Sequence, residues 1–576
     1  MAASILLSLI VASPCPGAVT TITSLWSGGT VLPGNTVVVS DGATIGGNVT
    51  TDGVLKFSHN GAITVSHAIT GSGTMMITSG GTTRLAGENS PSTVLLDLTT
   101  SIQAGVLQAG PGGGLDFSVG ENEPGILTVG GGMVRDRSCF IGQFGNRGIA
   151  SVTSGTLANS GDLFVGGDYG TGELSVSGGR VTNNSGYLGY SGGVGTATVS
   201  GGEWATADAL RIGNGGRGSL LLTGGRVASV HASLGTAPAG SGQILVQGGT
   251  WSTSGTIRMG GDGDAAVGLS GGMIESNAVN VFSGSATIAS GTWSSASFSM
   301  GSSSGTTNLN VTGGRLVAGT IFIGQEAGAI SLATMADGAW ESTQAFSVGE
   351  RGGGTVRVLG GSLSSPTMAL GNGSGVGELI QSGGSLGVTS WSAGAFTIGG
   401  SGTGFFRLSG GYAGVNYSAQ LGRDPSASGS AIITGGTWRS QGVRIGNAGT
   451  GRIEVNGGEL SAPSGWIVLG EQSSGRGDLS VSTGSLTFDS MQVGVNGVGV
   501  FHMTGGTAAT SVAYIGNASG GSGTASIQGG VWNANSLYIG PSGRGMVTIS
   551  DGSITSAVTT LGANSASLGE AKISGG

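Results

Sequence analysis

Hydrophobic and polar positions alternate along most of this chain, in short runs that end at glycine. In residues 174–177 (Leu-Ser-Val-Ser) and 210–212 (Leu-Arg-Ile), apolar residues are spaced two positions apart. That spacing places them on one face of an extended strand, because successive side chains of a β-strand point to opposite sides. The pattern therefore predicts many short β-strands separated by glycine-rich corners, and it lacks the spacing of a helix.

The strands and corners recur as one unit, of which residues 196–218 are typical. The unit contains an alternating strand, a Gly-Gly corner, a large apolar residue, a spacer, Leu-x-Ile-Gly and a glycine-rich turn. Three strands and three corners fill a unit and match one coil of a parallel β-helix, in which each coil pairs with the coils before and after it. From residue 126 onward we predict an all-β parallel β-helix (β-solenoid) of about 19 coils of roughly 23 residues.

The region before residue 126 lacks this period. Residues 19–68 contain short β-like runs, and we predict that they form an irregular β cap at the N-terminal end of the solenoid. The next region is residues 69–125. Its residues 69–110 contain a Gly-x-Gly opening, two alternating strands, Gly-Glu-Asn and then a strand that ends in Ala-Gly-Val-Leu. This order resembles the autotransporter-associated β-strand repeat.

The first 18 residues have the pattern of a signal peptide. The apolar run at residues 2–12 is too short to span a bilayer as a helix, and small residues follow it up to Ala18. We therefore predict cleavage after Ala18, and no other segment is apolar enough over its length to cross a membrane.

The repeat resembles a known group of exported proteins. Its Ile-Gly-x-x-Gly-x-Gly turn, alternating strand and Val-Ser-Gly-Gly corner are similar to the repeat shared by type V secretion (autotransporter) passengers and PEP-CTERM exosortase-sorted proteins. The resemblance covers residues 126–576 and implies a secreted or surface-displayed bacterial protein. The chain stops inside a unit, so we expect either a longer parent protein or an end that stacks on another molecule.

Composition and charge exclude several classes of protein. Glycine supplies 125 of 576 residues but proline only 11, which excludes collagen. The formal net charge is −8, and Lys56 and Lys572 are the only lysines, so the chain lacks the basic stripe that binding of nucleic acid requires. With two cysteines, Cys15 and Cys139, no disulfide framework or metal-ligand spacing is present.

Six tryptophans occupy one position of the repeat, two residues after the Gly corner. In other units this position is Val, Ile or Leu, so we predict that it faces inward and forms a buried ladder. The alternative left open is an exposed aromatic stripe that binds sugar. The six are Trp204, Trp251, Trp293, Trp340, Trp438 and Trp532.

The most promising binding residues lie where the repeat is lengthened. Several units between residues 385 and 470 are longer than average and carry extra aromatic residues, and insertions in a solenoid emerge as neighbouring loops. The candidate contacts to a ligand or glycan are Trp391, Tyr412, Tyr417 and Trp466.

Catalytic and metal sites are not predicted. The four histidines (His59, His67, His231 and His502) lie in separate units, and no pair has the spacing of metal ligands. Residues 260–264 (Gly-Gly-Asp-Gly-Asp) have the wrong phase for a calcium-binding β-roll. The carboxylates are scattered, whereas a polysaccharide lyase or hydrolase would need them clustered. We predict no catalytic residue, no metal and no cofactor.

The resulting hypothesis is a non-enzymatic, extracellular structural β-solenoid on the outer surface of a bacterium. It would serve as a passenger stalk, an adhesin-like rod, or a component of an extracellular matrix or filament. Expected partners are surface glycans, other cell-surface proteins, or further copies of the chain in head-to-tail contact. The alternative is a polysaccharide-binding or polysaccharide-degrading β-helix that uses the aromatic loops around residues 385–470.

Overall fold

The computed structural model describes residues 17–77, 82–85, 88–90, 93–96, 99–102, 106–108 and 116–575. Among these residues, all regular structure is β-strand. Nearly all of the predicted signal peptide, residues 1–18, lies outside them. The chain divides into two compact units, unit 1 (Met1–Val279) and unit 2 (Asn280–Gly576), which are treated separately below.

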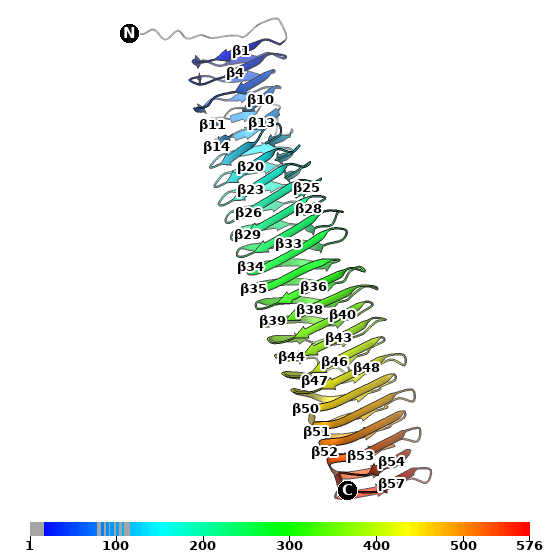
Figure 1. Ribbon diagram of the computed structural model, residues 1–576. Helices are drawn as coiled ribbons and strands as arrows, with labels where there is room; N and C mark the ends of the chain where they lie inside the picture. Colours follow the sequence, from blue (N-terminus) through cyan, green and yellow to red (C-terminus); the bar gives the residue numbers. More distant parts are fainter. Residues whose placement is uncertain are drawn as a thin grey trace. The chain divides into compact units, whose positions relative to one another are not determined.

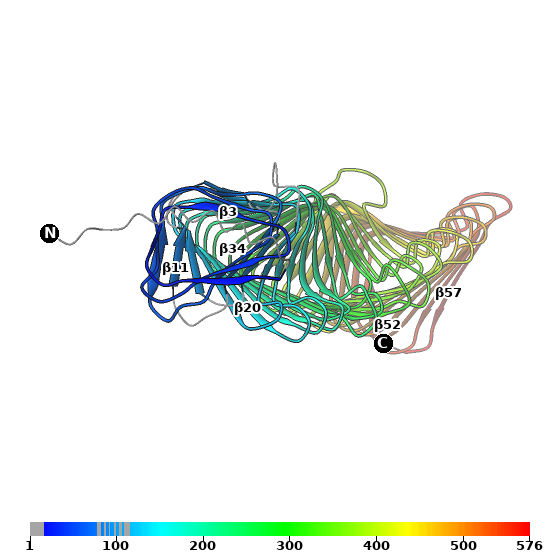
Figure 2. The same cartoon turned by 90° about the horizontal axis from the view of Figure 1, so that it is seen from above.

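Each coil of unit 1 contains three strands, and each strand pairs in parallel with its counterpart in the next coil (Figure 1). The first strand precedes the Gly-Gly corner, the second follows it, and the third carries the Leu-x-Ile segment. We call the resulting columns of strands the first, second and third stacks. Figure 2 shows unit 1 from above, with β3 and β11 on different sides of the coil. The predicted parallel β-solenoid is confirmed.

From residue 125 to Val279, unit 1 follows this plan without interruption. The first stack is β17 (Gly125–Val129), β20 (Arg147–Val152), β23 (Thr171–Val176), β26 (Val194–Val199), β29 (Arg217–Leu222) and β32 (Ser241–Val246). The second is β18 (Met133–Asp136), β21 (Thr156–Asn159), β24 (Arg180–Asn183), β27 (Glu203–Thr206) and β30 (Arg226–Ser229). The third is β19 (Cys139–Ile141), β22 (Leu163–Val165), β25 (Gly186–Tyr190), β28 (Ala209–Asn214) and β31 (His231–Leu234). β33 (Thr250–Met259) and β34 (Asp264–Val281) continue through their corners.

The N-terminal region is more regular than the predicted irregular cap. Its strands follow the same three-strand order in shorter coils: Thr36 pairs with Val54 and Val54 with Thr74, whereas later Val176 pairs with Val199 and Val199 with Leu222. β2 and β5 form a small parallel sheet of their own. The strands are β1 (Val19–Ile22), β2 (Leu25–Trp26), β3 (Gly29–Val31), β4 (Thr36–Val39), β5 (Thr44–Ile45), β6 (Val49–Thr51), β7 (Val54–Phe57), β8 (Ala62–Val65), β9 (Ile69–Thr70), β10 (Thr74–Ile77), β11 (Thr82–Leu85), β12 (Glu88–Ser90), β13 (Thr93–Leu96), β14 (Thr99–Ile102), β15 (Val106–Gln108) and β16 (Phe117–Val119).

Unit 2 has the same coil, with longer strands that bend through the corners. β52, for example, is one continuous strand. It runs from the first stack through the Gly505-Gly506 corner and supplies its coil's segments of the second and third stacks. The strands are β35 (Gly284–Met300), β36 (Thr306–Val311), β37 (Arg315–Ile323), β38 (Ile330–Met335), β39 (Ala339–Val348), β40 (Gly353–Val358), β41 (Ser362–Ser365), β42 (Thr367–Leu370), β43 (Val376–Gln381), β44 (Ser385–Val388), β45 (Phe396–Ile398), β46 (Thr403–Leu408), β47 (Tyr412–Leu421), β48 (Ser428–Ile433), β49 (Thr437–Ile445), β50 (Thr450–Leu469), β51 (Arg476–Val493), β52 (Val498–Ile515), β53 (Ser522–Ile539), β54 (Arg544–Ile549), β55 (Ser553–Thr555), β56 (Val558–Leu561) and β57 (Leu568–Ile573).

The six ladder tryptophans are fully buried, as predicted, so the exposed-stripe alternative is wrong. In unit 1, Trp204 is in register with Val227, and Val227 with Trp251. In unit 2, Leu316 lies between Trp293 and Trp340 in the same way. Alternation with a smaller side chain leaves each indole room to pack, because its neighbours in the column are not equally large.

Glycine follows the third strand of the coil because of the backbone conformation needed there. Gly213 has φ 72°, which places it in the left-handed region, and a Cβ there would overlap the backbone of Ser241 in the next coil. Glycine is therefore required both for the turn and for the close stacking of coils. Across the described ranges, the structure also contains no helix of the length and hydrophobicity that crossing a bilayer demands.

Candidate functional site

A surface groove of about 550 Å³ crosses four successive coils of unit 2, at the corner between the second and third stacks. It contains two of the four predicted aromatic residues. Its lining residues are Trp391, Tyr412, Gly414, Val415, Asn416, Arg439, Ser440, Gln441, Ala462, Pro463, Ser464 and Gly465. We call it the aromatic groove.

Trp391 reaches the groove on an inserted loop, residues 389–395, which joins β44 to β45. Its side chain is 66% exposed. The loop is held by hydrogen bonds at both ends: the Ser390 amide donates to the Pro366 carbonyl (3.1 Å), and the Gly394 amide donates to Ser418 Oγ (3.0 Å). Asn416 Nδ2 donates to the Thr389 carbonyl at 2.8 Å and ties the loop to the next coil. The tryptophan is thus exposed on a braced loop.

Tyr412 lies on the outward face of β47, where it is 45% exposed. A Cβ at Gly414 would lie 2.8 Å from Tyr412 Cε1, so the ring lies over this glycine. Across the groove stands the second inserted segment, which includes Pro463 and Ser464. The hydrogen-bonded 389–395 loop therefore forms one side of the groove, and the inserted segment with Pro463 and Ser464 forms the opposite side. Trp391 and Tyr412 supply the exposed aromatic rings.

The other two predicted aromatic residues lie outside the lining of the groove. Trp466 is half-buried on the third stack, where the Arg444 guanidinium lies 4.4 Å from the centre of its ring and Gly442 packs beneath it. Arg444 also pairs with Glu471 at 2.6 Å. Tyr417 is half-buried, and its carbonyl accepts a hydrogen bond from Ser440 Oγ. Both positions are consistent with packing roles on the surface of the coil.

Sequence reasoning missed the polar side chains of the groove, Asn416, Arg439 and Gln441. They occupy outward positions that carry polar residues in most coils, so nothing in their own segments distinguishes them. Only their position beside the two inserted loops makes them part of a site.

A second groove continues along the same corner of unit 2. It has a volume of about 560 Å³, and Pro463 lines both grooves. Small and amide side chains form its surface, among them Thr487, Ala509, Asn533 and Asn535. The corner between the second and third stacks is thus hollow over many successive coils, with the exposed rings of Trp391 and Tyr412 at one end and the buried Phe488 in the second groove.

The far side of the 389–395 loop covers a smaller polar pocket of about 260 Å³, which we call the Arg423 pocket. It lies on the outward face of the third stack and shares no lining residue with the aromatic groove. Its lining residues are Phe322, Ala345, Phe346, Ser347, Glu350, Thr367, Met368, Ala369, Asn372, Gly394, Ala395, Thr397 and Arg423.

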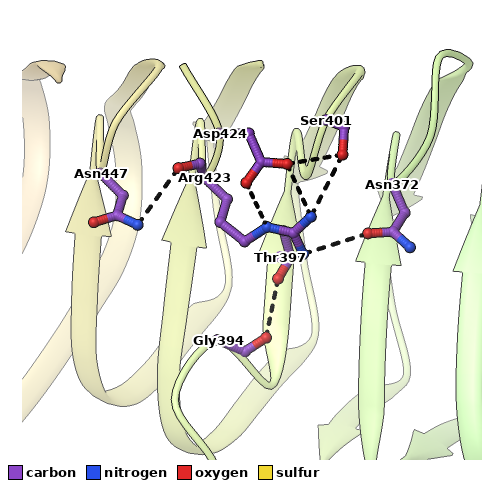
Figure 3. A network of polar contacts seen from close by, with 7 residues as sticks. All are labelled: Asn372, Gly394, Thr397, Ser401, Arg423, Asp424 and Asn447. Atoms are coloured by element: carbon purple, nitrogen blue, oxygen red, sulfur yellow. Dashed lines mark hydrogen bonds and ion pairs between the residues drawn. The ribbon is translucent and has the colours of Figure 1, made fainter. Parts of the chain in front are cut away.

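Arg423 is the centre of the network drawn in Figure 3. Its Nε donates to Asp424 Oδ1 at 3.0 Å and its Nη2 donates to Asp424 Oδ2 at 3.1 Å. The hydrogen bond to Asp424 raises the pKa of Arg423, and the same bond lowers the pKa of Asp424. Arg423 Nη1 reaches Asn372 Oδ1, two coils away, at 3.5 Å. Both side chains of the ion pair are therefore charged at neutral pH.

Within the described ranges, no group of three or more His, Cys, Asp and Glu side chains has the geometry to hold a metal ion. Of the histidines, His59 is buried with Nε2 2.8 Å from Thr83 Oγ1, and His231 Nδ1 accepts a bond from the Thr256 amide. Unit 1 does contain one buried carboxylate, Asp136, whose Oδ1 accepts a hydrogen bond from Asn159 Nδ2 at 2.6 Å.

Comparison with known protein families, with curated proteins and with solved structures finds no match to this chain. The resemblance of the repeat to autotransporter passengers and PEP-CTERM proteins therefore stays a prediction. What the coil geometry does establish is that the chain is a β-solenoid repeat protein.

Proposed function

We propose that this chain is a secreted or cell-surface structural β-solenoid, a stalk, adhesin-like rod or matrix component, and that it carries out no catalysis. The observation behind the proposal is the column of inward residues that continues from coil to coil through the described part of each unit. In unit 2 the column includes Trp293, Leu316, Trp340 and Leu363, each buried and each in register with the next.

Such a column supports a structural role because stability accumulates coil by coil. Every coil adds its own backbone hydrogen bonds to its neighbours and buries its own apolar side chains, each contributing about 1.5–3 kcal/mol. A scaffold built in this way needs no cofactor to hold its shape, so its length can change without loss of the core.

The proposal is tested on intact cells of the source organism, with antibodies against one segment of each unit. We expect protease added outside the cells to remove both epitopes while a cytoplasmic marker survives. Epitopes that become sensitive only after lysis would contradict the surface location. In parallel, the purified protein should keep its β circular dichroism and its melting temperature after dialysis against EDTA.

The aromatic groove favours a second candidate function, the binding of a polysaccharide. Sugar rings present apolar faces to aromatic side chains and hydroxyl groups to polar ones. Trp391 and Tyr412 offer exposed rings, and Asn416, Arg439 and Gln441 offer donors and acceptors beside them. The hollow corner beyond Pro463 provides room for a longer chain.

This candidate is tested by affinity electrophoresis against a panel of neutral and acidic polysaccharides. In any polysaccharide that binds, we expect Trp391→Ala and Tyr412→Ala each to weaken binding about tenfold or more, since exposed aromatic anchors dominate such interfaces. Tyr169→Ala is the matched control, because Tyr169 is a 79% exposed aromatic residue of unit 1. Binding that survives both groove substitutions, or no binding across the panel, would reject this function.

A further inference from the structure

We propose that the Arg423 pocket is a separate binding site for a single neutral sugar ring. The proposal extends the carbohydrate-binding candidate to a second place on unit 2 but does not depend on the aromatic groove. The 389–395 loop separates the two, with Trp391 in the groove and Gly394 in the pocket.

The floor of the pocket is organised in advance. Phe322, Ser347, Ala369 and Thr397 are in register on successive strands of the third stack and face outward. Ser347 and Thr397 are nevertheless only 5% and 4% exposed. Ser347 Oγ donates to Glu350 Oε2 at 2.6 Å, and Thr397 Oγ1 donates to the Gly394 carbonyl at 2.9 Å. A ligand would thus meet polar groups already fixed in position, which lowers the entropic cost of binding.

The rim of the pocket has unused hydrogen-bonding capacity of both kinds. A guanidinium has five N–H donors in a planar fork. Asp424 and Ser401 engage Nε and Nη2 of Arg423, whereas Nη1 makes only the long contact of 3.5 Å with Asn372 Oδ1. A hydroxyl group placed there can accept from Arg423 Nη1 and donate to Asn372 Oδ1 at once, which matches the chemistry of a sugar hydroxyl.

The charges and the volume of the pocket restrict the class of ligand further. The carboxylates of Asp424 and Glu350 and the Asn372 carbonyl oxygen disfavour an anion, and the Arg423 guanidinium disfavours a cation. The volume of about 260 Å³ lies below the usual range of drug-sized sites, so it suits one ring. Phe322 offers an apolar surface to the C–H face of that ring.

The test uses saturation-transfer NMR and calorimetry on the full chain with glucose, galactose, mannose and N-acetylglucosamine. Glucuronic acid and glucosamine serve as charged probes of the same size. We expect at least one neutral sugar to bind in the millimolar range and the charged probes to bind more weakly. A complete lack of signal from the neutral sugars, or tighter binding of glucuronic acid, would overturn the proposal.

Two substitutions locate the binding. Arg423→Lys keeps the positive charge but removes the planar fork, and Phe322→Ala removes the apolar surface; each should weaken binding at least tenfold. Trp391→Ala should leave it unchanged. Circular dichroism and melting curves verify that each variant is folded. If Arg423→Lys does not fold, the binding measured for Phe322→Ala decides the test. Unchanged monosaccharide binding in these variants would reject the Arg423 pocket as the binding site. Loss of polysaccharide binding in Trp391→Ala with monosaccharide binding retained would reject neither site and would confirm that they are separate.

Discussion

Unit 1 and unit 2 share one coil, and some of their coils differ in character at one interior position, two residues after the ladder residue. In the first regular coils of unit 1 this position holds Asp136, Asn159 and Asn183. In several coils of unit 2 it is apolar, as at Val388 and Val415. The solenoid therefore tolerates polar and apolar residues at the same interior position, and unit 2 contains both kinds, as at Ser365, Val388 and Ser440.

The polar column of unit 1 is bonded along its length but incompletely. Asn159 Nδ2 donates to Asp136 Oδ1, and Trp204 Nε1 donates to Asn183 Oδ1 at 2.8 Å. Asp136 Oδ2, Asn159 Oδ1 and Asn183 Nδ2 are buried without a hydrogen-bond partner. Since an unmade hydrogen bond in the interior costs about 1–3 kcal/mol, this column adds directional contacts at the expense of stability.

Around Val415, unit 2 has aromatic packing in place of such a contact. Phe396, Phe406 and Trp438 form a T-shaped cluster with ring centres 5.2 to 5.9 Å apart. The indole Nε1 of Trp438 is buried without a partner, and the corresponding residue of the preceding coil, Val415, has no acceptor to offer. Both units therefore bury polar groups without partners, since Trp251 Nε1 of unit 1 is unpaired like Trp438 Nε1 of unit 2, and three substitutions test how the two units differ.

The largest effect is expected for Trp438→Ala in unit 2. Removing a buried tryptophan at the centre of an aromatic cluster should lower the free energy of unfolding of this unit by about 3–5 kcal/mol. Hydrogen exchange measured peptide by peptide would locate the loss around β46 to β50. Trp391→Ala, which removes an exposed tryptophan from the same unit, should cost less than about 0.5 kcal/mol. Equal losses in the two variants would contradict the assignment of the cluster as core.

Part of this comparison could be predicted from the sequence. Alternation and Gly-Gly corners are local signals, so the coil and the Trp204 ladder were predictable. The coils before residue 126 are shorter, and their Gly-Gly pairs (Gly28-Gly29, Gly46-Gly47 and Gly80-Gly81) do not recur at the later spacing, so the period was missed there. The lengthened units pointed to Trp391 and Tyr412, but the packing of Trp466 under Arg444 depends on a neighbouring coil.

The Arg423 pocket was beyond prediction for a physical reason. Arg423 and Asn372 are 51 residues apart in the chain and meet only because the side chain of Arg423 reaches across an intervening coil. No spacing within one repeat marks either residue. Predicting a site that forms between coils therefore requires the register of the strands in each stack, which the sequence pattern alone specifies only approximately.

The second effect concerns Asp136 and pH. Burial raises the pKa of Asp136 from 3.8 to about 8, opposed by the hydrogen bond from Asn159 and reinforced by the charge of Asp116. Between these values the folded state holds a proton that the unfolded state releases. The free energy of unfolding of unit 1 should therefore fall as pH rises from about 4 to about 8.

Asp136→Asn should abolish this slope and make unit 1 more stable than the parent protein at pH 7.5. Denaturant unfolding of both proteins at several pH values, with hydrogen exchange to locate unit 1, provides the measurement. Asp262→Asn is the control, since Asp262 is an exposed aspartate of the same unit. If the parent and Asp136→Asn lose stability in parallel across the window, Asp136 is not the group that titrates.

The smallest effect is expected for a substitution in unit 2 that supplies a buried indole with a hydrogen-bond acceptor. Trp204 donates to Asn183 of the preceding coil, and Trp532 donates to Thr510 in the same way at 3.2 Å. Val415 occupies the corresponding place before Trp438, and threonine has nearly the shape of valine. Val415→Thr should therefore give Trp438 Nε1 an acceptor and raise the free energy of unfolding by up to about 1 kcal/mol, because the gain from the hydrogen bond is offset by burial of the hydroxyl.

Val388→Thr is the matched control for this last prediction. Val388 is equally interior, but the ladder residue of the next coil is Ala413, which has no group to donate. The same hydroxyl there should lower the free energy of unfolding by about 1–3 kcal/mol. Melting curves and denaturant unfolding of the two variants give the difference directly. If both variants lose stability equally, the indole is not limited by a missing acceptor, and the polar and apolar columns differ only in packing.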